Sequence, residues 1–500
     1  MKLSQLGLSV LLIFVFGLTN GHGQSIAVPW SGHGHDPQHT AISPTHAQPL
    51  GQIRWQMPVD LDRQYWGSSL LVHYGSPLIT RQNTALVPVK VGGGDTFRVE
   101  ARNPADGAVK WMAQSDYSLP PHGWTPPFGI ALTPKNRLYY PGAGGTVYFR
   151  DSPDAASGAT GQLAFYGAPQ YQADPATFDD NVKISTPITA DRYGTIYFGF
   201  QVLGSNPANL QSGLARIAED GVATWIFAGE AASDGGIQQV VLNCAPALSN
   251  DGKKLYVAVT FGSYSGGYML MLDSRTLATQ AKIRLTDPLY PDSDAKLADD
   301  GSAAPTIGPD GDVYYGVLEA APYSNHFRGW LLHFDGALTQ RKIAGSFGWD
   351  DTASIVPASL VPSYTGSSEY LILTKYNDYV SAGGSGVNRL ALVDPNASMI
   401  SSINGATVMN EVLAIACPTP DWEYPNVPGA VREWCINTAA IDPATKSALA
   451  GAEDGKLYRW SFETNSFSEV LTLTNGVGEA YTPTMVGVDG TVYAIADGTL

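Results

Sequence analysis

Residues 305–314 read PTIGPDGDVY, and residues 483–493 read PTMVGVDGTVY. Each stretch opens with a proline and a short apolar run, turns at Asp-Gly, and continues with a β-branched residue and a tyrosine. Asp-Gly between apolar runs indicates a tight hairpin, because glycine supplies the positive φ that such turns require. β-branched and aromatic residues suit a pleated, half-buried strand. The two stretches therefore predict pairs of short antiparallel strands.

The same pattern recurs along the chain at intervals of about 58 residues. Its apolar openings begin at Pro77, Pro127, Pro187, Pro246, Pro305, Pro357, Ala439 and Pro483. Each unit carries signals for four short strands, which is the make-up of a propeller blade. We expect an all-β fold: one eight-bladed β-propeller of four-stranded antiparallel blades over residues 51–500, with seven blades as the alternative. The longest interval is assigned to an insertion at residues 417–435.

The two ends of this repeat region complement each other. The last unit stops after three expected strands, at Leu500. Residues 52–57 (QIRWQM) look like an isolated fourth strand. Pairing them would close the ring and remove the exposed sheet edges.

Composition and charge exclude several classes of protein. The chain has 54 Gly and 34 Pro, 10% aromatic residues and only 15% charged residues. Aromatic residues at this level argue against disorder, and the low charge argues against a coiled coil or helical bundle. A net charge of −16 argues against nucleic acid as a partner.

The N-terminus predicts export. Lys2 precedes an apolar run at residues 8–18, which is too short to span a bilayer. We expect a signal peptide at residues 1–23, a lead-in segment at residues 24–50, no membrane span, and a secreted or periplasmic protein. An uncleaved N-terminal anchor is the alternative.

The chain has three cysteines. Cys417 and Cys435 lie 18 residues apart, and in an exported protein they could form a disulfide. Two buried thiols are the equal alternative. Cys244 is expected to be a small buried apolar residue.

Two segments resemble a known repeat. Residues 101–111 (ARNPADGAVKW) and 215–225 (ARIAEDGVATW) are similar to the tryptophan-docking repeat of the pyrroloquinoline-quinone (PQQ)-like propellers, with its glycine and tryptophan kept in both. Residues 30–40 (WSGHGHDPQHT) resemble the lead-in of bacterial PQQ-like repeat proteins. This superfamily includes quinoprotein alcohol dehydrogenases, which hold PQQ with calcium, and non-enzymatic scaffolds. Many of the dehydrogenases carry adjacent cysteines, which this chain lacks, so no cofactor is expected; PQQ and calcium are the alternative.

Polar residues gather where propeller loops share one face. The loops before each first strand and between the second and third strands lie at one face, here called the top, and binding residues concentrate on such loops. Convergent polar side chains are what a polar ligand requires. The candidates are His73, Tyr74, Lys90, His122, Trp124, Lys183, Asn243, Asp300, Arg328, Asp351, Lys375, Asn377, Glu433, Asn437, Glu479 and Tyr481.

These residues predict a scaffold that binds a polar small molecule, a glycan or a protein through a top-face funnel. The alternative is an enzyme on the same scaffold, either a PQQ- and calcium-dependent alcohol or sugar dehydrogenase or a propeller-fold polysaccharide lyase. An acidic loop adds Asp292, Asp294 and Asp299 as calcium candidates, because calcium prefers carboxylate oxygens. A solvated acidic loop is the competing interpretation.

Overall fold

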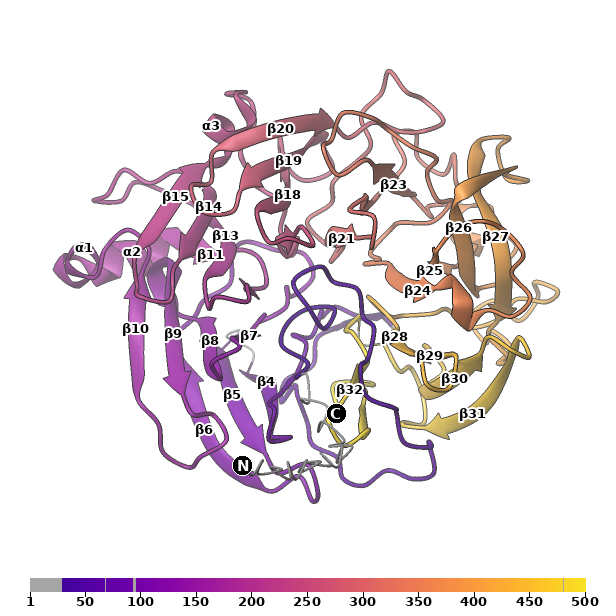
Figure 1. Cartoon of the computed structure of the whole chain (residues 1–500), viewed down its shortest axis with the longest axis horizontal. Coiled ribbons are helices and arrows are strands. Elements are labelled where there is room, and N and C mark those ends of the chain that lie inside the picture. The colour runs from indigo at the N-terminus through magenta and orange to yellow at the C-terminus, as the bar shows by residue number, and fades with distance from the viewer. Residues whose placement is uncertain (1–28, 68, 93–95, 480) are drawn as a thin grey trace, which may run out of the picture.

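The computed structural model describes residues 29–67, 69–92, 96–479 and 481–500. The predicted signal peptide at residues 1–23 and the start of the lead-in segment lie outside the described residues. The described chain is built from antiparallel sheets set side by side around a central axis (Figure 1). Helices are short: α1 (Ala168–Ala173), α2 (Pro175–Asn181) and α3 (Ala228–Ala232). In this part of the chain no helix is long and apolar enough to cross a membrane.

The sheets follow one another along the sequence. After a small hairpin, β1 (Tyr65–Trp66) and β2 (Ser69–Leu70), comes a sheet of β3 (Leu78–Ile79), β4 (Ala85–Gly92), β5 (Thr96–Arg102) and β6 (Val109–Ser115). The next sheet holds β7 (Ala131–Leu132), β8 (Arg137–Pro141), β9 (Thr146–Asp151) and β10 (Thr160–Ala164). In the third, β11 (Val182–Ile184) and β12 (Thr189–Ala190) both pair with β13 (Ile196–Val202), followed by β14 (Gly213–Ile217) and β15 (Ala223–Phe227). The fourth repeats this plan with β16 (Gln239–Val240), β17 (Ala247–Leu248), β18 (Lys254–Thr260), β19 (Gly267–Asp273) and β20 (Thr279–Arg284).

The second half continues the pattern with more variation. A three-stranded sheet holds β21 (Thr306–Ile307), β22 (Val313–Val317) and β23 (Trp330–Phe334). Four-stranded sheets follow, with β24 (Ser354–Pro357), β25 (Tyr370–Tyr376), β26 (Arg389–Ile400) and β27 (Thr407–Ala416), then β28 (Ala440–Asp442), β29 (Ser447–Gly451), β30 (Lys456–Ser461) and β31 (Ser466–Thr472). The last sheet contains β32 (Met485–Val486) and β33 (Val492–Tyr493). The all-β class and the four-stranded antiparallel units are confirmed.

The innermost strands are short because the sheets crowd together at the axis. A Cβ added to Gly129 would lie 2.4 Å from Pro187 of the next unit, so only glycine permits this approach.

One prediction from the sequence is wrong for the sixth unit. Pro357 was expected to open a strand, but it ends β24 instead. Ala358–Leu360 then forms a short 3-10 turn before the chain reaches β25.

The repeat glycine and tryptophan have clear structural roles. Gly107 has φ 69°, and a Cβ there would lie 2.7 Å from the Trp55 ring. Trp111 is buried, donates its indole N–H to the carbonyl of Pro153 at 2.7 Å, and lies under the Arg150 guanidinium. Trp111 therefore docks on the next sheet, whereas Trp225 of the second copy is 39% exposed and packs edge-on against Phe165 of the preceding unit.

The two ends of the described chain meet. Met57 and Leu500 exchange two backbone hydrogen bonds of 2.9 Å, and an antiparallel bridge joins Pro58 to Thr499. Leu500 is 8% exposed. The prediction of a strand at residues 52–57 was wrong, since these residues form no strand, but the segment ends in contact with the last residues of the chain.

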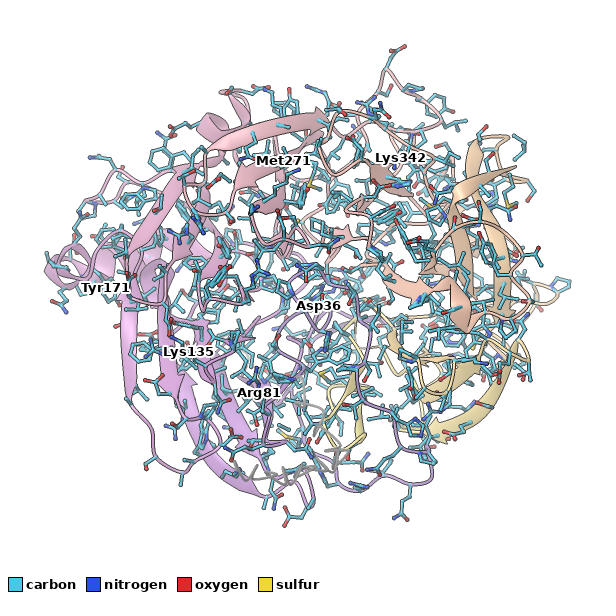
Figure 2. All side chains as sticks on the ribbon, viewed as in Figure 1. Asp36, Arg81, Lys135, Tyr171, Met271 and Lys342 are labelled. Atoms are coloured by element: carbon cyan, nitrogen blue, oxygen red, sulfur yellow. The ribbon has the colours of Figure 1, made fainter. Side chains whose placement is uncertain are left out.

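The lead-in segment, residues 29–50, crosses the middle of the molecule (Figure 1). Its carbonyls accept backbone hydrogen bonds from residues of the inner strands: Ile79, Leu132, Leu248, Ile307, Ile355 and Ile441. Most of these donors are the last residue of an inner strand, so the segment covers the end of the axis where inner strands finish. We call this the bottom end; the inner strands begin at the top end. Figure 2 shows Asp36 of the segment near the middle of the molecule.

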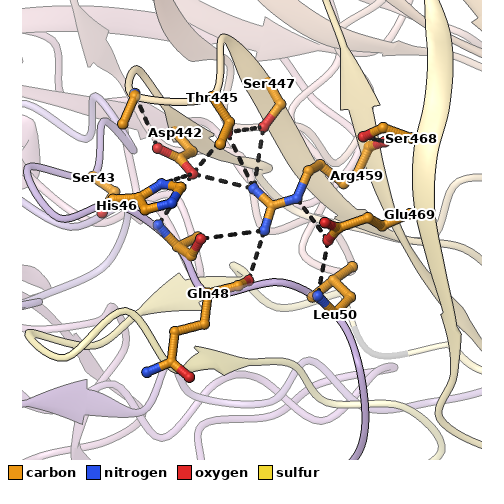
Figure 3. A network of polar contacts seen from close by, with 12 residues as sticks. Ser43, His46, Gln48, Leu50, Asp442, Thr445, Ser447, Arg459, Ser468 and Glu469 are labelled. Atoms are coloured by element: carbon orange, nitrogen blue, oxygen red, sulfur yellow. Dashed lines mark hydrogen bonds and ion pairs between the residues drawn. The ribbon is translucent and has the colours of Figure 1, made fainter.

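A polar network ties the segment to the β28–β31 sheet (Figure 3). The Arg459 guanidinium contacts Asp442 at 3.1 Å and Glu469 at 2.9 Å, and donates to the carbonyl of Gln48 at 2.7 Å. Asp442 in turn accepts the backbone N–H of Ala47 at 3.1 Å. The cation thus links two strands of the sheet to the lead-in segment.

Candidate functional site

Three aromatic side chains from separate loops meet at the top end. The ring of His73 lies 5.5 Å from that of Trp124 and 5.3 Å from that of Tyr481, measured between centroids. Trp124 and Tyr481 are 5.2 Å apart, edge to face. These three predicted site residues are therefore brought together, and their rings occupy the mouth of the funnel.

At the same end of the axis, three buried side chains, one of them His73, each leave one polar atom without a partner among the described residues. The Nε2–H of His73 donates to the carbonyl of Asp300 at 2.9 Å, and its Nδ1 lies 3.9 Å from the Asp350 carboxylate without a hydrogen bond. Asn243 donates to the carbonyl of Gly301 at 2.8 Å, and Asn437 donates to Ser302. Both asparagine Oδ1 atoms lack a partner among the described residues. Buried polar atoms rarely stay unpaired, so this is where a water or a polar ligand atom is expected.

A small cavity lies beside these atoms on the axis. Its lining includes His33 of the lead-in segment, Tyr74, Asn243, Ser302 and Tyr481. Only about 10 Å³ of it is open to the centre of a water molecule, which is room for about one water. Burial lowers the pKa of His33 well below its usual value, and the neighbouring His39 adds to this, so His33 is neutral. The funnel is therefore shallow: the lead-in segment fills the axis from below.

Three carboxyl groups gather beside Tyr481. Cys435, Glu453 and Glu479 place their ligand atoms within 4.8 Å of one another. Burial raises the pKa of Glu453 to about 7. Burial and repulsion from Glu453 raise the pKa of Glu479 to about 8. The pKa of Glu433 rises well above its usual value for the same two reasons, burial first. We call Glu433, Cys435, Glu453 and Glu479 the carboxyl cluster.

A buried arginine borders this cluster. Arg432 is fully buried, lies 2.9 Å from Asp421 and forms an ion pair with Glu453. The Trp422 ring covers it at 3.7 Å. Arg432 and Asp421 belong to the expected insertion at residues 417–435, so that segment serves to support the cluster. Glu453 was not among the predicted site residues, although it lies in the loop between β29 and β30, a second-to-third-strand loop of the kind expected at the top end.

Lys375 and Asp351 complete the polar wall. The Lys375 ammonium donates to the carbonyl of Asp350 at 2.9 Å and lies 5.7 Å from the centre of the Tyr481 ring. Burial raises the pKa of Asp351 to about 7, although Lys375 and a hydrogen bond from Thr374 oppose the shift. Both residues were among the predicted site residues, and Lys375 connects them to the Tyr481 ring.

Other predicted residues are engaged away from the mouth. Tyr74 donates to Asp60 at 3.1 Å, and Lys90 lies 3.5 Å from the same carboxylate. Lys183 donates to Ser118 at 2.5 Å, and its pKa is lowered by burial.

Two more of them bond to nearby backbone. Asn377 bonds to both backbone polar groups of Trp434. The imidazole of His122 lies 2.7 Å from the carbonyl of Pro120. Arg328 lines a separate pocket described below.

The acidic loop does not gather its carboxylates around one point. Asp294 binds Arg284 through both oxygens, at 2.6 and 2.7 Å. Asp299 precedes Asp300 in the chain, and Oδ2 of Asp300 accepts a hydrogen bond from the Tyr264 hydroxyl at 2.6 Å. Among the described residues, Asp292, Asp294 and Asp299 do not gather into a group that could hold a metal ion. Asp294 is in addition already paired with Arg284.

All three cysteines are free and buried, which corrects the disulfide expectation. Cys417 packs in the apolar core of the last sheets, next to Trp434 and Tyr458. Cys435 lies in the carboxyl cluster instead. The two cysteines are close in sequence, but Cys417 is surrounded by apolar side chains and Cys435 by carboxyl groups.

Comparisons with known proteins address the fold. No protein-family model and no curated protein matches the chain. Among solved structures, a europium-containing methanol dehydrogenase aligns at 9% identity over 93% of this chain and 89% of that chain, with a TM-score of 0.56. A quinohemoprotein alcohol dehydrogenase from Comamonas testosteroni aligns at 10% identity over 94% and 70%, with a TM-score of 0.44. At such identity the likeness concerns the fold alone, and the described chain shares the overall fold of that methanol dehydrogenase.

Proposed function

We propose that this protein is an exported, non-catalytic scaffold that binds a small, positively charged polar ligand at the top end of an eight-bladed propeller. The reciprocal hydrogen bonds between Met57 and Leu500 support closure of the ring by residues 52–57. Export rests on the basic start and the short apolar run at residues 8–18. Sequencing the N-terminus of the secreted protein tests the cleavage at residue 23.

One observation carries the proposal: the two ends of the axis differ. The bottom end is covered by the lead-in segment, whose carbonyls take up inner-strand N–H groups. The top end instead leaves Nδ1 of His73 and Oδ1 of Asn243 and Asn437 buried without partners. Water or a ligand must satisfy such atoms, because an unpaired buried polar group costs about 1–3 kcal/mol.

The charge at the top end selects a cation. Burial raises the pKa values of Glu433, Glu453 and Glu479, and repulsion from Glu453 adds to the shifts of Glu433 and Glu479. Arg432 compensates only part of this charge, because it also pairs with Asp421. A cation would relieve the repulsion, and the neighbouring Tyr481 and Trp124 rings would attract it through their faces. A metal ion and a small organic ammonium share this chemistry.

PQQ fits these residues poorly. It is a planar, three-ring tricarboxylate, so its site must supply cations and a flat slot. The top end supplies the carboxyl cluster instead, and the cavity on the axis has room for about one water. The three aromatic rings already pack against one another at 5.2–5.5 Å. We therefore derive no quinone chemistry here.

The lyase arrangement is also incomplete. Abstraction of a sugar proton would need a base, a tyrosine acid and a cation around one ring. His73 and Lys375 both lie near Tyr481, but Tyr74 is bonded to Asp60 and Arg328 lines another pocket. Binding without chemistry is the function that the geometry supports best.

Calorimetric titration tests the proposal. Wild type is titrated separately with Ca²⁺, Zn²⁺ and choline at constant ionic strength, beside Glu479→Gln. Glu463→Gln is the matched control, because Glu463 is half-exposed and pairs with Lys446 at the surface. We expect one cation to bind wild type and the control equally, and Glu479→Gln at least about tenfold more weakly. Absence of binding by all three, or equal binding by both variants, would overturn the proposal.

A further inference from the structure

A second pocket lies away from the carboxyl cluster, between the β21–β23 sheet and the β24–β27 sheet. Its volume is about 540 Å³, which is within the range of small-molecule sites. Its lining includes His326, Arg328, Tyr376, Asp378 and Arg389. These residues come from the loop after β22, the last residue of β25 and the loop after it, and the start of β26, so the pocket opens between two adjacent units.

Arg328 is the unusual member of this lining. Its side chain belongs to a residue that is only 4% exposed, and no ion pair of Arg328 exists among the described residues. The guanidinium carbon lies 4.4 Å from the centre of the Tyr376 ring and 5.9 Å from that of Phe347. Aromatic faces stabilise a cation, but they accept no conventional hydrogen bond from it. A buried arginine normally has a carboxylate partner, since desolvating its charge is costly.

The unpaired donors form one edge of the guanidinium. Nε and Nη2 of Arg328 have no hydrogen-bond partner among the described residues. These two N–H groups lie on the same side of the planar group and are parallel, which is the arrangement that binds both oxygens of a carboxylate.

The nearby acids are already used. His326 lies 2.7 Å from Asp378, which also accepts the Ser385 hydroxyl at 2.7 Å. Arg389 pairs with Glu411 at 3.4 Å. Asp378 acts on Arg328 through space, but no carboxylate among the described residues forms an ion pair with its guanidinium, so Nε and Nη2 remain without a bonded acceptor.

We propose that this pocket binds the carboxylate of a small hydroxylated acid, such as a sugar acid, with Arg328 as its main anchor. Arg389, which pairs with Glu411, lies 5.9 Å from the same Tyr376 ring and borders the position of the anion. Ser401 and Ser402 line the pocket and offer hydroxyl groups to the rest of the ligand. This site is independent of the cation site at the axis and takes a ligand of opposite charge.

Calorimetry with D-glucuronate, D-glucose and inorganic phosphate at pH 7 and fixed ionic strength tests the inference. We expect glucuronate to bind and glucose, its uncharged counterpart, not to bind. Arg328→Lys keeps the charge but removes the paired donors, so it should weaken glucuronate at least about tenfold. Arg192→Gln, which removes a surface arginine elsewhere, is the matched control.

The remaining outcomes are equally decisive. If Arg328→Lys fails to fold, Arg389→Gln replaces it, because that half-buried side chain should be dispensable for folding and should also weaken glucuronate. Phosphate binding that is as tight as glucuronate and insensitive to Arg328→Lys would overturn the carboxylate assignment. Equal glucuronate affinity in wild type and both pocket variants would overturn the site. Glu479→Gln should leave glucuronate binding unchanged, which separates this test from that of the axial site.

Discussion

Replacing Arg459 with methionine should unfold the protein at lower denaturant and release the lead-in segment. The substitution keeps the apolar stem but removes the cation between Asp442 and Glu469 (Figure 3). Asp442 is fully buried, so its charge would lose the Arg459 guanidinium while staying out of water. Breaking a buried pair by removing one partner typically costs about 3–5 kcal/mol.

The lower half of that range applies here. Asp442 keeps three donors: the N–H groups of Ala47 and Ala444 and the hydroxyl of Thr445. We therefore expect a loss of about 3 kcal/mol in the free energy of unfolding, which is more than a hundredfold in the folding equilibrium. The control is Lys135→Met, whose exposed pair with Glu219 should contribute less than about 1 kcal/mol.

Equilibrium urea unfolding measures the global effect, and hydrogen exchange measures the local one. The N–H groups of Ala47 and Leu50 donate to Asp442 and Glu469, so they should exchange faster in Arg459→Met. A loss below about 1 kcal/mol, with unchanged exchange at both amides, would refute the reasoning. The lead-in segment would then be held by its backbone bonds alone.

Three further predictions concern other parts of the molecule. Burial raises the pKa of Glu479 to about 8 in the folded state, against an ordinary value of 4.5, so the folded state binds more protons between these values and stability should fall as the pH rises through this window. Urea midpoints from pH 5 to 9 should fall less steeply in Glu479→Gln, and parallel slopes would contradict the burial argument. Deleting Leu500 removes a buried side chain and its bonds to Met57, so it should cost about 3 kcal/mol by urea unfolding; an unchanged midpoint would exclude a closing role. Alkylation without reductant should label no cysteine in the native protein and all three in urea, because each thiol is free and buried; fewer than three labels by mass would reveal a disulfide.

The strand units were predictable because their signals are local. Asp310-Gly311 and Asp489-Gly490 lie in tight turns whose glycines have φ 91° and 83°. Gly107 and Trp111 likewise keep the roles that their repeat implies. Pro357 misled because a proline can end a strand as readily as it can open one, and only the neighbouring sheet decides between them.

The site was only partly predictable. Loop position correctly marked Glu433, Glu479 and Tyr481, which meet in space. It equally marked Lys90 and Lys183, whose ammonium groups are taken up by nearby oxygen atoms. Polar residue type and loop position do not distinguish a side chain that faces the axis from one that supports its own loop.

The sequence by itself determined the all-β class, the repeated four-stranded unit and the contact between the two chain ends. These follow from turn chemistry and from strand patterns that extend over a few residues. Only the tertiary structure decided that the lead-in segment covers one end of the axis, that Cys435 joins Glu453 and Glu479, and that Arg328 lacks an acidic partner. Each of these depends on which distant side chains share a buried space, and burial is what turns an ordinary charge or amide into one that requires a partner.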